Sequence, residues 1–252
     1  MIDVHCHLEQ KEFSNKDEII EKCKKELKAV ITCCAHPKDL ELTFNLVNKY
    51  NGFVFCTVGL HPGYIKEIKE EEKESFLEEI EKNKDKVSGI GEIGLDYNWI
   101  KEAKWREKQR ELFIELINFA KRLDKPIVVH ARDAFLDAIE ILEKENVKKV
   151  LMHLFGDKKL VERVKNNGWF ISIGPILLKS KTHKKIVKAM PLERILLETD
   201  SPWFPVNAKI GYPWNVKYVA EKIAEIKKID VKEVERITDE NAKNFFGLEI
   251  KL

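Results

Sequence analysis

Residues 2–7 read Ile-Asp-Val-His-Cys-His, a short apolar and β-branched run that closes on two histidines. Successive side chains of a strand alternate between its faces, so His5 and His7 point to one side and Cys6 to the other. Runs of this kind recur along the chain and alternate with longer amphipathic segments rich in lysine and glutamate. This alternation predicts parallel strands joined by helical crossovers.

Eight such runs occur in the 252 residues, which favours an α/β fold, a single closed (β/α)8 barrel of the TIM type. The rival, an open doubly wound sheet, is expected to carry a glycine-rich turn after its first strand, and none follows His5. No repeat or linker interrupts residues 1–252, so one domain is expected. The expected strands are Ile2–His5, Ala29–Cys34, Phe53–Leu60, Val87–Ile93, Pro126–His130, Lys149–His153, Trp169–Ile173 and Arg194–Asp200. The expected helices include Trp105–Leu123, Ala134–Leu142 and Leu160–Val164, with a C-terminal pair at Val216–Ile226 and Val231–Phe246.

Composition excludes several classes of protein. The formal net charge of +2, from 45 Lys+Arg against 43 Asp+Glu, makes no global case for binding nucleic acid. No apolar run approaches the ~20 residues of a membrane span, and no signal-peptide pattern opens the chain, so a cytoplasmic protein is expected. The 5 cysteines are odd in number and lack a C-x-x-C pair, which predicts buried free thiols.

Residues of metal-ligand type fall at the C-terminal ends of the expected strands, where barrel enzymes place their chemistry. Because strand eight neighbours strand one in a closed barrel, Asp200 should stand beside the two histidines of strand one. Strands four, five and six should bring a second group together. Imidazole and carboxylate ligands without thiolate suit zinc, manganese, iron or magnesium. The six expected metal ligands are His5, His7, Glu92, His130, His153 and Asp200.

Three further residues lie close to these positions. His61 follows strand three on the same rim. Its role is either to contact the substrate or to support the structure. Arg132 follows His130 by two residues and either holds a phosphate or forms a salt bridge at the start of a helix. Glu198 shares the inward face with Asp200, where it either orients the site from behind the ligands or belongs to a structural network.

Several motifs in combination resemble the TatD-type metal-dependent hydrolases of the amidohydrolase superfamily. The resemblance covers about residues 2–246 and implies a metal-dependent deoxyribonuclease, often exonucleolytic, that acts on DNA or another phosphodiester. It also implies two divalent ions bridged by Glu92, with Asp200 both binding an ion and accepting the proton of the nucleophile. The stretches that carry it are residues 3–7, 59–62, 91–97, 130–132 and 197–202, together with Thr238, Asn241 and Phe245-Phe246.

The chain departs from the family pattern around the substrate. Leu154-Phe155-Gly156-Asp157 follows His153 where Cys-Phe-Ser-Gly is usual, and Gly174-Pro175-Ile176 replaces a Ser-Gly pair. The arginine common between Pro205 and Pro213 is missing. Two other functions therefore stay open: an amidohydrolase acting on a small cyclic amide, ester or phosphoester, and a non-catalytic barrel that binds nucleic acid. The sequence leaves the oligomeric state undetermined.

Overall fold

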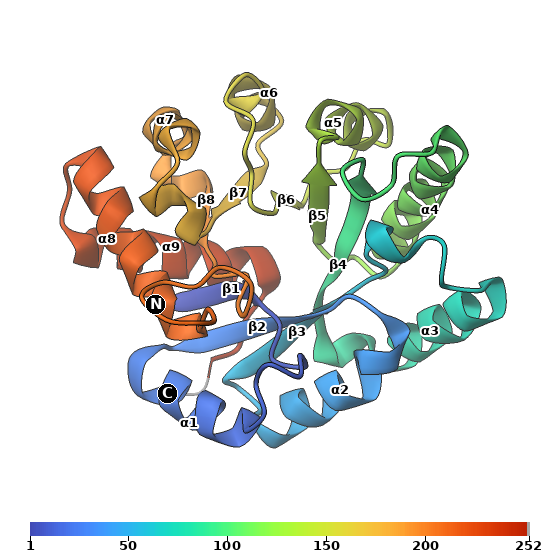
Figure 1. Cartoon of the computed structure of the whole chain (residues 1–252), viewed down its shortest axis with the longest axis horizontal. Helices are drawn as coiled ribbons and strands as arrows, with labels where there is room; N and C mark the ends of the chain where they lie inside the picture. Colours follow the sequence, from blue (N-terminus) through green and yellow to red (C-terminus); the bar gives the residue numbers. More distant parts are fainter. Residues whose placement is uncertain (251–252) are drawn as a thin grey trace.

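A computed structural model describes residues 1–250 and shows eight parallel strands in the order in which they occur along the chain (Figure 1). The (β/α)8 prediction is confirmed: the strands form a nearly closed barrel and the helices lie around it. The strands are β1 (Ile2–Cys6), β2 (Ala29–Cys34), β3 (Val54–Val58), β4 (Val87–Asp96), β5 (Ile127–Arg132), β6 (Val150–Met152), β7 (Phe170–Ile173) and β8 (Ile195–Leu197).

The crossover segments between strands are helical, and two helices follow β8. The α-helices are α1 (Lys16–Glu26), α2 (Leu40–Lys49), α3 (Glu70–Lys82), α4 (Ala103–Arg122), α5 (Phe135–Lys144), α6 (Val161–Asn166), α7 (Lys181–Ala189), α8 (Val216–Lys227) and α9 (Val231–Phe246). Short 3-10 turns are η1 (Pro37–Asp39), η2 (Pro62–Tyr64), η3 (Lys84–Lys86), η4 (Pro175–Leu178), η5 (Leu192–Arg194) and η6 (Pro213–Asn215).

The first and last strands meet through backbone hydrogen bonds just beyond β8. The amide of Asp200 donates to the carbonyl of His5 over 2.9 Å, and the amide of His7 donates to the carbonyl of Ser201 over 2.8 Å. Both bonds lie at the C-terminal end of β1. The contact that draws the barrel together is therefore also the one that sets Asp200 beside the two histidines.

Two separate apolar cores are present, one inside the barrel and one outside it. The outer one lies between strands and surrounding helices and includes Cys6, which is turned away from the barrel interior. The inner one is plugged by α9, whose Phe245 and Phe246 pack against side chains that point inward from the strands. These apolar side chains fill the N-terminal half of the barrel interior, away from water. The opposite end of the interior contains polar side chains. The inner core contains Ile2, Val4, Ala29, Ile31, Val128, Leu151 and Leu196.

The predicted element bounds differ from the structure mainly at the ends that carry polar residues. β3, β6 and β8 end before His61, His153 and Asp200. His61 is still extended, with φ −62° and ψ 132°, whereas Asp200 has a φ of 51°. β4 and β5 instead run on to Asp96 and Arg132, which pair with each other. The C-terminal helix Val231–Phe246 has the expected bounds.

Two expectations drawn from composition can be compared with the structure. All 5 cysteines are free and buried, as expected. Within residues 1–250, no helix combines the length and the apolar character that crossing a membrane would demand.

Gly94 allows the close approach of β4 to β5 near the site. Its φ is 142°, and a Cβ at this position would lie 2.1 Å from the carbonyl oxygen of its register partner, His130. Only glycine fits such a position without moving one of the strands. The register between β4 and β5 depends on the fact that Gly94 has no side chain. The contact between Glu92 and His130 depends on the same register.

We predict that Gly94→Ala lowers the free energy of unfolding by about 3 kcal/mol or more, since it combines an unfavourable φ with a backbone clash. Gly168→Ala is the matched control: Gly168 has a φ of 72°, but nothing lies within 4 Å of its Cβ position. The control should cost only about 1 kcal/mol. Urea denaturation of both variants measures the difference, and equal losses would show that the clash at Gly94 is relieved at no cost.

Candidate active site

The six expected metal ligands meet at the C-terminal end of the barrel, with Glu92 between them. One carboxylate oxygen of Glu92, Oε1, lies 2.6 Å from Nδ1 of His130 and 3.7 Å from Nε2 of His153. The other, Oε2, lies 3.3 Å from Nε2 of His5 and 4.0 Å from Nε2 of His7. A single buried carboxylate thus faces histidines from β1, β5 and the end of β6.

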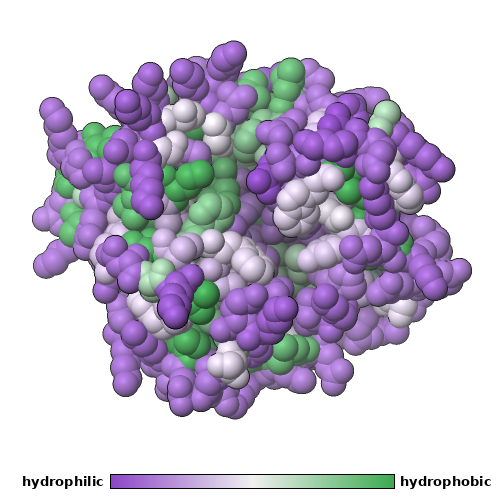
Figure 2. All heavy atoms as spheres, in the orientation of Figure 1, coloured by the Kyte–Doolittle hydropathy of each residue, from purple (hydrophilic) through white to green (hydrophobic). Residues whose placement is uncertain are grey.

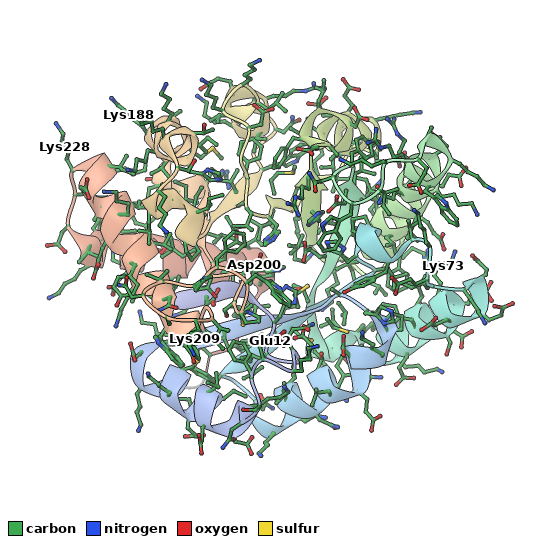
Figure 3. All side chains as sticks on the ribbon, viewed as in Figure 1. Glu12, Lys73, Lys188, Asp200, Lys209 and Lys228 are labelled. Carbon is green, nitrogen blue, oxygen red and sulfur yellow. The ribbon has the colours of Figure 1, made fainter. Side chains whose placement is uncertain are left out.

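Asp200 completes the group on the β1 side. Its Oδ1 lies 3.3 Å from Nε2 of His7 and 3.6 Å from Nε2 of His5. Figure 3 shows Asp200 near the centre of the molecule, whereas Lys73, Lys188 and Lys228 extend at its periphery. His5, His7 and Asp200 offer one set of ligand atoms close enough to hold an ion, and His5, Glu92 and His153 offer another.

The two groups expected from strand order share more than was predicted. The rings of His5 and His153 lie 3.9 Å apart between centroids, so His5 belongs to both groups. His130 contacts Glu92 and also forms a third group of ligand-type atoms with His61 and Asp96. The arrangement is one continuous site about a shared carboxylate and not two separate sites.

Three histidines of the site are held by carboxylates on the side away from Glu92. Nδ1 of His7 lies 3.0 Å from Glu9, Nε2 of His130 lies 3.0 Å from Asp96, and Nδ1 of His153 lies 2.8 Å from Glu198. An ionised carboxylate only accepts hydrogen bonds, so the ring nitrogen that faces it carries the proton. The other nitrogen of each ring faces the carboxylates at the centre of the site and is the one that would bind a metal ion, as in metal-binding histidines.

His5 gives the clearest sign that these residues fit a metal ion. The ring is fully buried, yet neither of its nitrogens has a hydrogen-bond partner among the described residues. An unpaired buried polar group is costly. A divalent ion bound to Nε2, between Glu92 and Asp200, would pair this nitrogen and offset the negative charge of both carboxylates.

The charges in the protein alone favour an anionic centre. Burial by itself raises the pKa of Glu92, but His153, His130 and His5 outweigh burial and hold the pKa well below its usual range. Asp200 behaves similarly, since burial raises its pKa and His7 and His153 bring the net pKa below the ordinary value. Both carboxylates are therefore ionised at neutral pH and available to a cation.

Two of the supporting carboxylates, Glu9 and Asp96, were not assigned a role from the sequence. Both are buried, and Glu9 also accepts a hydrogen bond from Thr32 over 2.9 Å. For Asp96 the signal was present, because it continues the two-residue period of Glu92 along β4; Glu9 lies in the turn beyond β1, where that period does not apply. Side chains two apart on a strand share a face.

Glu198 uses both carboxylate oxygens next to the site. Oε2 accepts from His153, and Oε1 accepts from the backbone amide of Leu154 over 2.9 Å. These contacts favour a role in orienting His153 over a separate structural network.

His61 and Arg132 both line the cavity above the cluster. Nδ1 of His61 accepts from the amide of Gly63 over 2.9 Å, so its Nε2 carries the proton, 3.2 Å from His130. Burial and His130 lower the pKa of His61 to about 3, which keeps the ring neutral. Arg132 is exposed and forms no ion pair within residues 1–250; its guanidinium lies 6.0 Å from the ring centre of Trp99.

The cavity has a volume of about 660 Å³. A space-filling view shows a hollow near the middle of this face of the molecule (Figure 2). Glu92, His130, His153 and Asp200 lie among its lining residues, so the cluster is open to a ligand. Trp99 and Trp203, with exposed fractions of 57% and 50%, also line it.

Comparison with known proteins identifies related chains over nearly the full length. A family model described as TatD related DNase matches residues 2–247. The human protein named deoxyribonuclease TATDN3 is 36% identical, covering 98% of this chain and 94% of that one. An uncharacterized metal-dependent hydrolase of Methanocaldococcus jannaschii is 37% identical, over 97% and 96% of the two chains. The crystal structure of a TatD homologue from Escherichia coli superposes with a TM-score of 0.90 at 23% identity and covers 98% of each chain, which shows the shared fold.

We predict that Glu198→Gln weakens metal binding by roughly 10- to 100-fold, because an amide cannot accept from His153 and from the Leu154 amide with both of its end atoms. Titration calorimetry of the metal-stripped protein with zinc or manganese measures the affinity. Glu233→Gln is the control, since Glu233 pairs with Arg236 on the surface of α9. Equal affinities in both variants would remove Glu198 from the support of the site.

Proposed function

The chain belongs to the family of TatD-related DNases, and we propose that it hydrolyses phosphodiester bonds of DNA with water activated at a site for two divalent ions. The observation that carries this proposal is Glu92, a buried anion that faces two sets of histidines at once. Relatives named as a deoxyribonuclease and as a metal-dependent hydrolase support the same reaction class.

We propose that His5, His7 and Asp200 hold one ion, that His130 and His153 hold the other, and that Glu92 bridges them. When bound, such a pair supplies a water of lowered pKa and positive charge for the phosphoryl oxygens. The imidazole-rich ligand set favours zinc or manganese over magnesium.

Asp200 is the proposed base. Its carboxylate is ionised and lies at the cavity wall, so it can accept the proton of the attacking water as well as bind an ion. The neutral His61 presents Nε2–H toward the same space, where it can donate to an oxygen of the scissile phosphate. Arg132, free of ion pairs within the described chain, is placed to bind a neighbouring phosphate.

We further propose that barrel and α9 act as one hydrolase domain, because α9 fills the end of the barrel interior. A cytoplasmic location is proposed on the 5 free buried thiols, which suit a reducing compartment.

The first test is cleavage of single-stranded, double-stranded and 3′-tailed DNA by metal-stripped protein to which single divalent ions are returned. We predict that activity vanishes on stripping and returns with zinc or manganese. His130→Ala, purified in parallel, should stay inactive and so exclude a contaminating nuclease. Metal binding without cleavage of any nucleic acid would contradict the proposal and shift the assignment to a hydrolase of small amides, esters or phosphoesters.

A second prediction concerns the base. Asp200→Asn should keep the melting temperature near that of the unaltered protein but lower kcat by roughly a thousandfold, because the amide cannot accept the proton. Steady-state kinetics at saturating metal separate this effect from weaker ion binding. Undiminished kcat would exclude Asp200 as the base.

A further inference from the structure

His183, the third residue of α7, is a donor facing the cavity that the proposed mechanism does not use. Its side chain is more than nine-tenths buried, with 7% exposure, and it is among the lining residues. The Cε1–Nε2 edge of its ring lies beside Gly156, in the loop after β6: both atoms are 3.6 Å from the position of a Cβ on that glycine. The ring therefore forms part of the wall between β6 and α7.

Ser180, the N-terminal cap of α7, hydrogen-bonds to the ring of this histidine. Its hydroxyl oxygen accepts from the His183 amide over 3.2 Å and lies 2.8 Å from Nδ1 of the ring. In the tautomer in which the hydroxyl donates to Nδ1, the ring hydrogen is on Nε2. Nε2 has no protein partner within residues 1–250, and in this tautomer it is a free N–H donor at the cavity wall.

Apolar side chains line the wall beside this donor. The side chain of Leu154 lies over Gly174, so closely that a Cβ there would come within 2.7 Å, and Ile176 lines the cavity with an exposed fraction of 37%. Burial lowers the pKa of His183, so its ring is neutral at neutral pH. Of the residues that line the cavity, Arg132 is the one lysine or arginine, and Lys188 of α7 extends away at the periphery (Figure 3).

These features select among the parts of a nucleotide. A phosphate is an anion and is bound in proteins mainly by cations and several donors. A nucleobase is flat and largely apolar on its faces, and its edge carries neutral acceptors, carbonyl oxygens and ring nitrogens. One neutral donor in an apolar wall matches the base and not the phosphate.

We propose that Leu154, Gly156, Ile176 and His183 form a subsite for the nucleobase next to the scissile bond, in which Nε2–H of His183 donates to an acceptor on the base. The proposal rests on the proposed function, because it names the part of the DNA substrate that this wall recognises. Removing the donor should remove the hydrogen-bonded part of the contribution that the base makes to the reaction and leave the hydrolytic machinery intact.

The experiment measures kcat/KM of the metal-loaded full chain on the dinucleotide thymidylyl-thymidine. Two analogues, each with tetrahydrofuran in place of one thymidine sugar and base, report the base on either side of the phosphate. In the unaltered protein, loss of the correct base should lower kcat/KM about tenfold, the size of one hydrogen bond with its apolar contact. His183→Phe keeps a ring and the apolar wall without the donor and should lose most of this preference for the full dinucleotide.

Three variants complete the design. If His183→Phe does not fold, His183→Ala takes its place in the kinetic comparison. His183→Gln places an amide N–H near Nε2 and should keep the preference for the base, and Lys188→Ala, on the same helix, should behave as the unaltered protein. Melting temperature and metal content check that each protein is folded and loaded.

Two results would overturn the inference while leaving the proposed function standing: cleavage of all substrates by the unaltered protein with no preference for either base, or a preference that survives undiminished in His183→Phe and His183→Ala. Absence of cleavage of the dinucleotide and of longer DNA would instead overturn the proposed function, and the subsite with it.

Discussion

A carboxylate buried among histidines is the constraint on which this structure depends. Glu92 is almost fully removed from water and still ionised, because positive or hydrogen-bonding groups surround both of its oxygens. Burial of a charge is tolerated only when it is paired. Strand ends from β1, β4, β5 and β6, with the segment after β8, must converge on one point to provide that pairing.

The barrel meets this demand by dividing its interior into two halves. Toward the N-terminal ends of the strands, aliphatic side chains and the aromatic residues of α9 form a dry core. Toward the other end, Glu9, Asp96 and Glu198 lie behind the histidines and hold each ring with its other nitrogen toward the centre of the site. Within the barrel, one half is an apolar core, while the other gathers groups that a stable core alone would not contain.

Much of this organisation could be predicted from the sequence, because strand period and strand order are strong constraints. Alternation places His5 and His7 on one face, and barrel closure places Asp200 beside them; the structure shows both. The sharing of His5 between the two groups could not be predicted, since it depends on how far each strand end bends inward. The bounds of β8 were missed for a similar reason: the left-handed φ of Asp200 is set by tertiary contacts and not by its local sequence. His183 was overlooked because its helical position gives no sign that it faces the cavity.

Anomalous X-ray diffraction from crystals saturated with zinc or manganese tests the central claim, that Glu92 bridges two ions, most directly. The account predicts two anomalous peaks about 3.5–4 Å apart, one beside His5, His7 and Asp200 and the other beside His130 and His153. The carboxylate of Glu92 should lie between the peaks. A single peak at saturation, or two peaks that both lie out of reach of Glu92, would contradict the account.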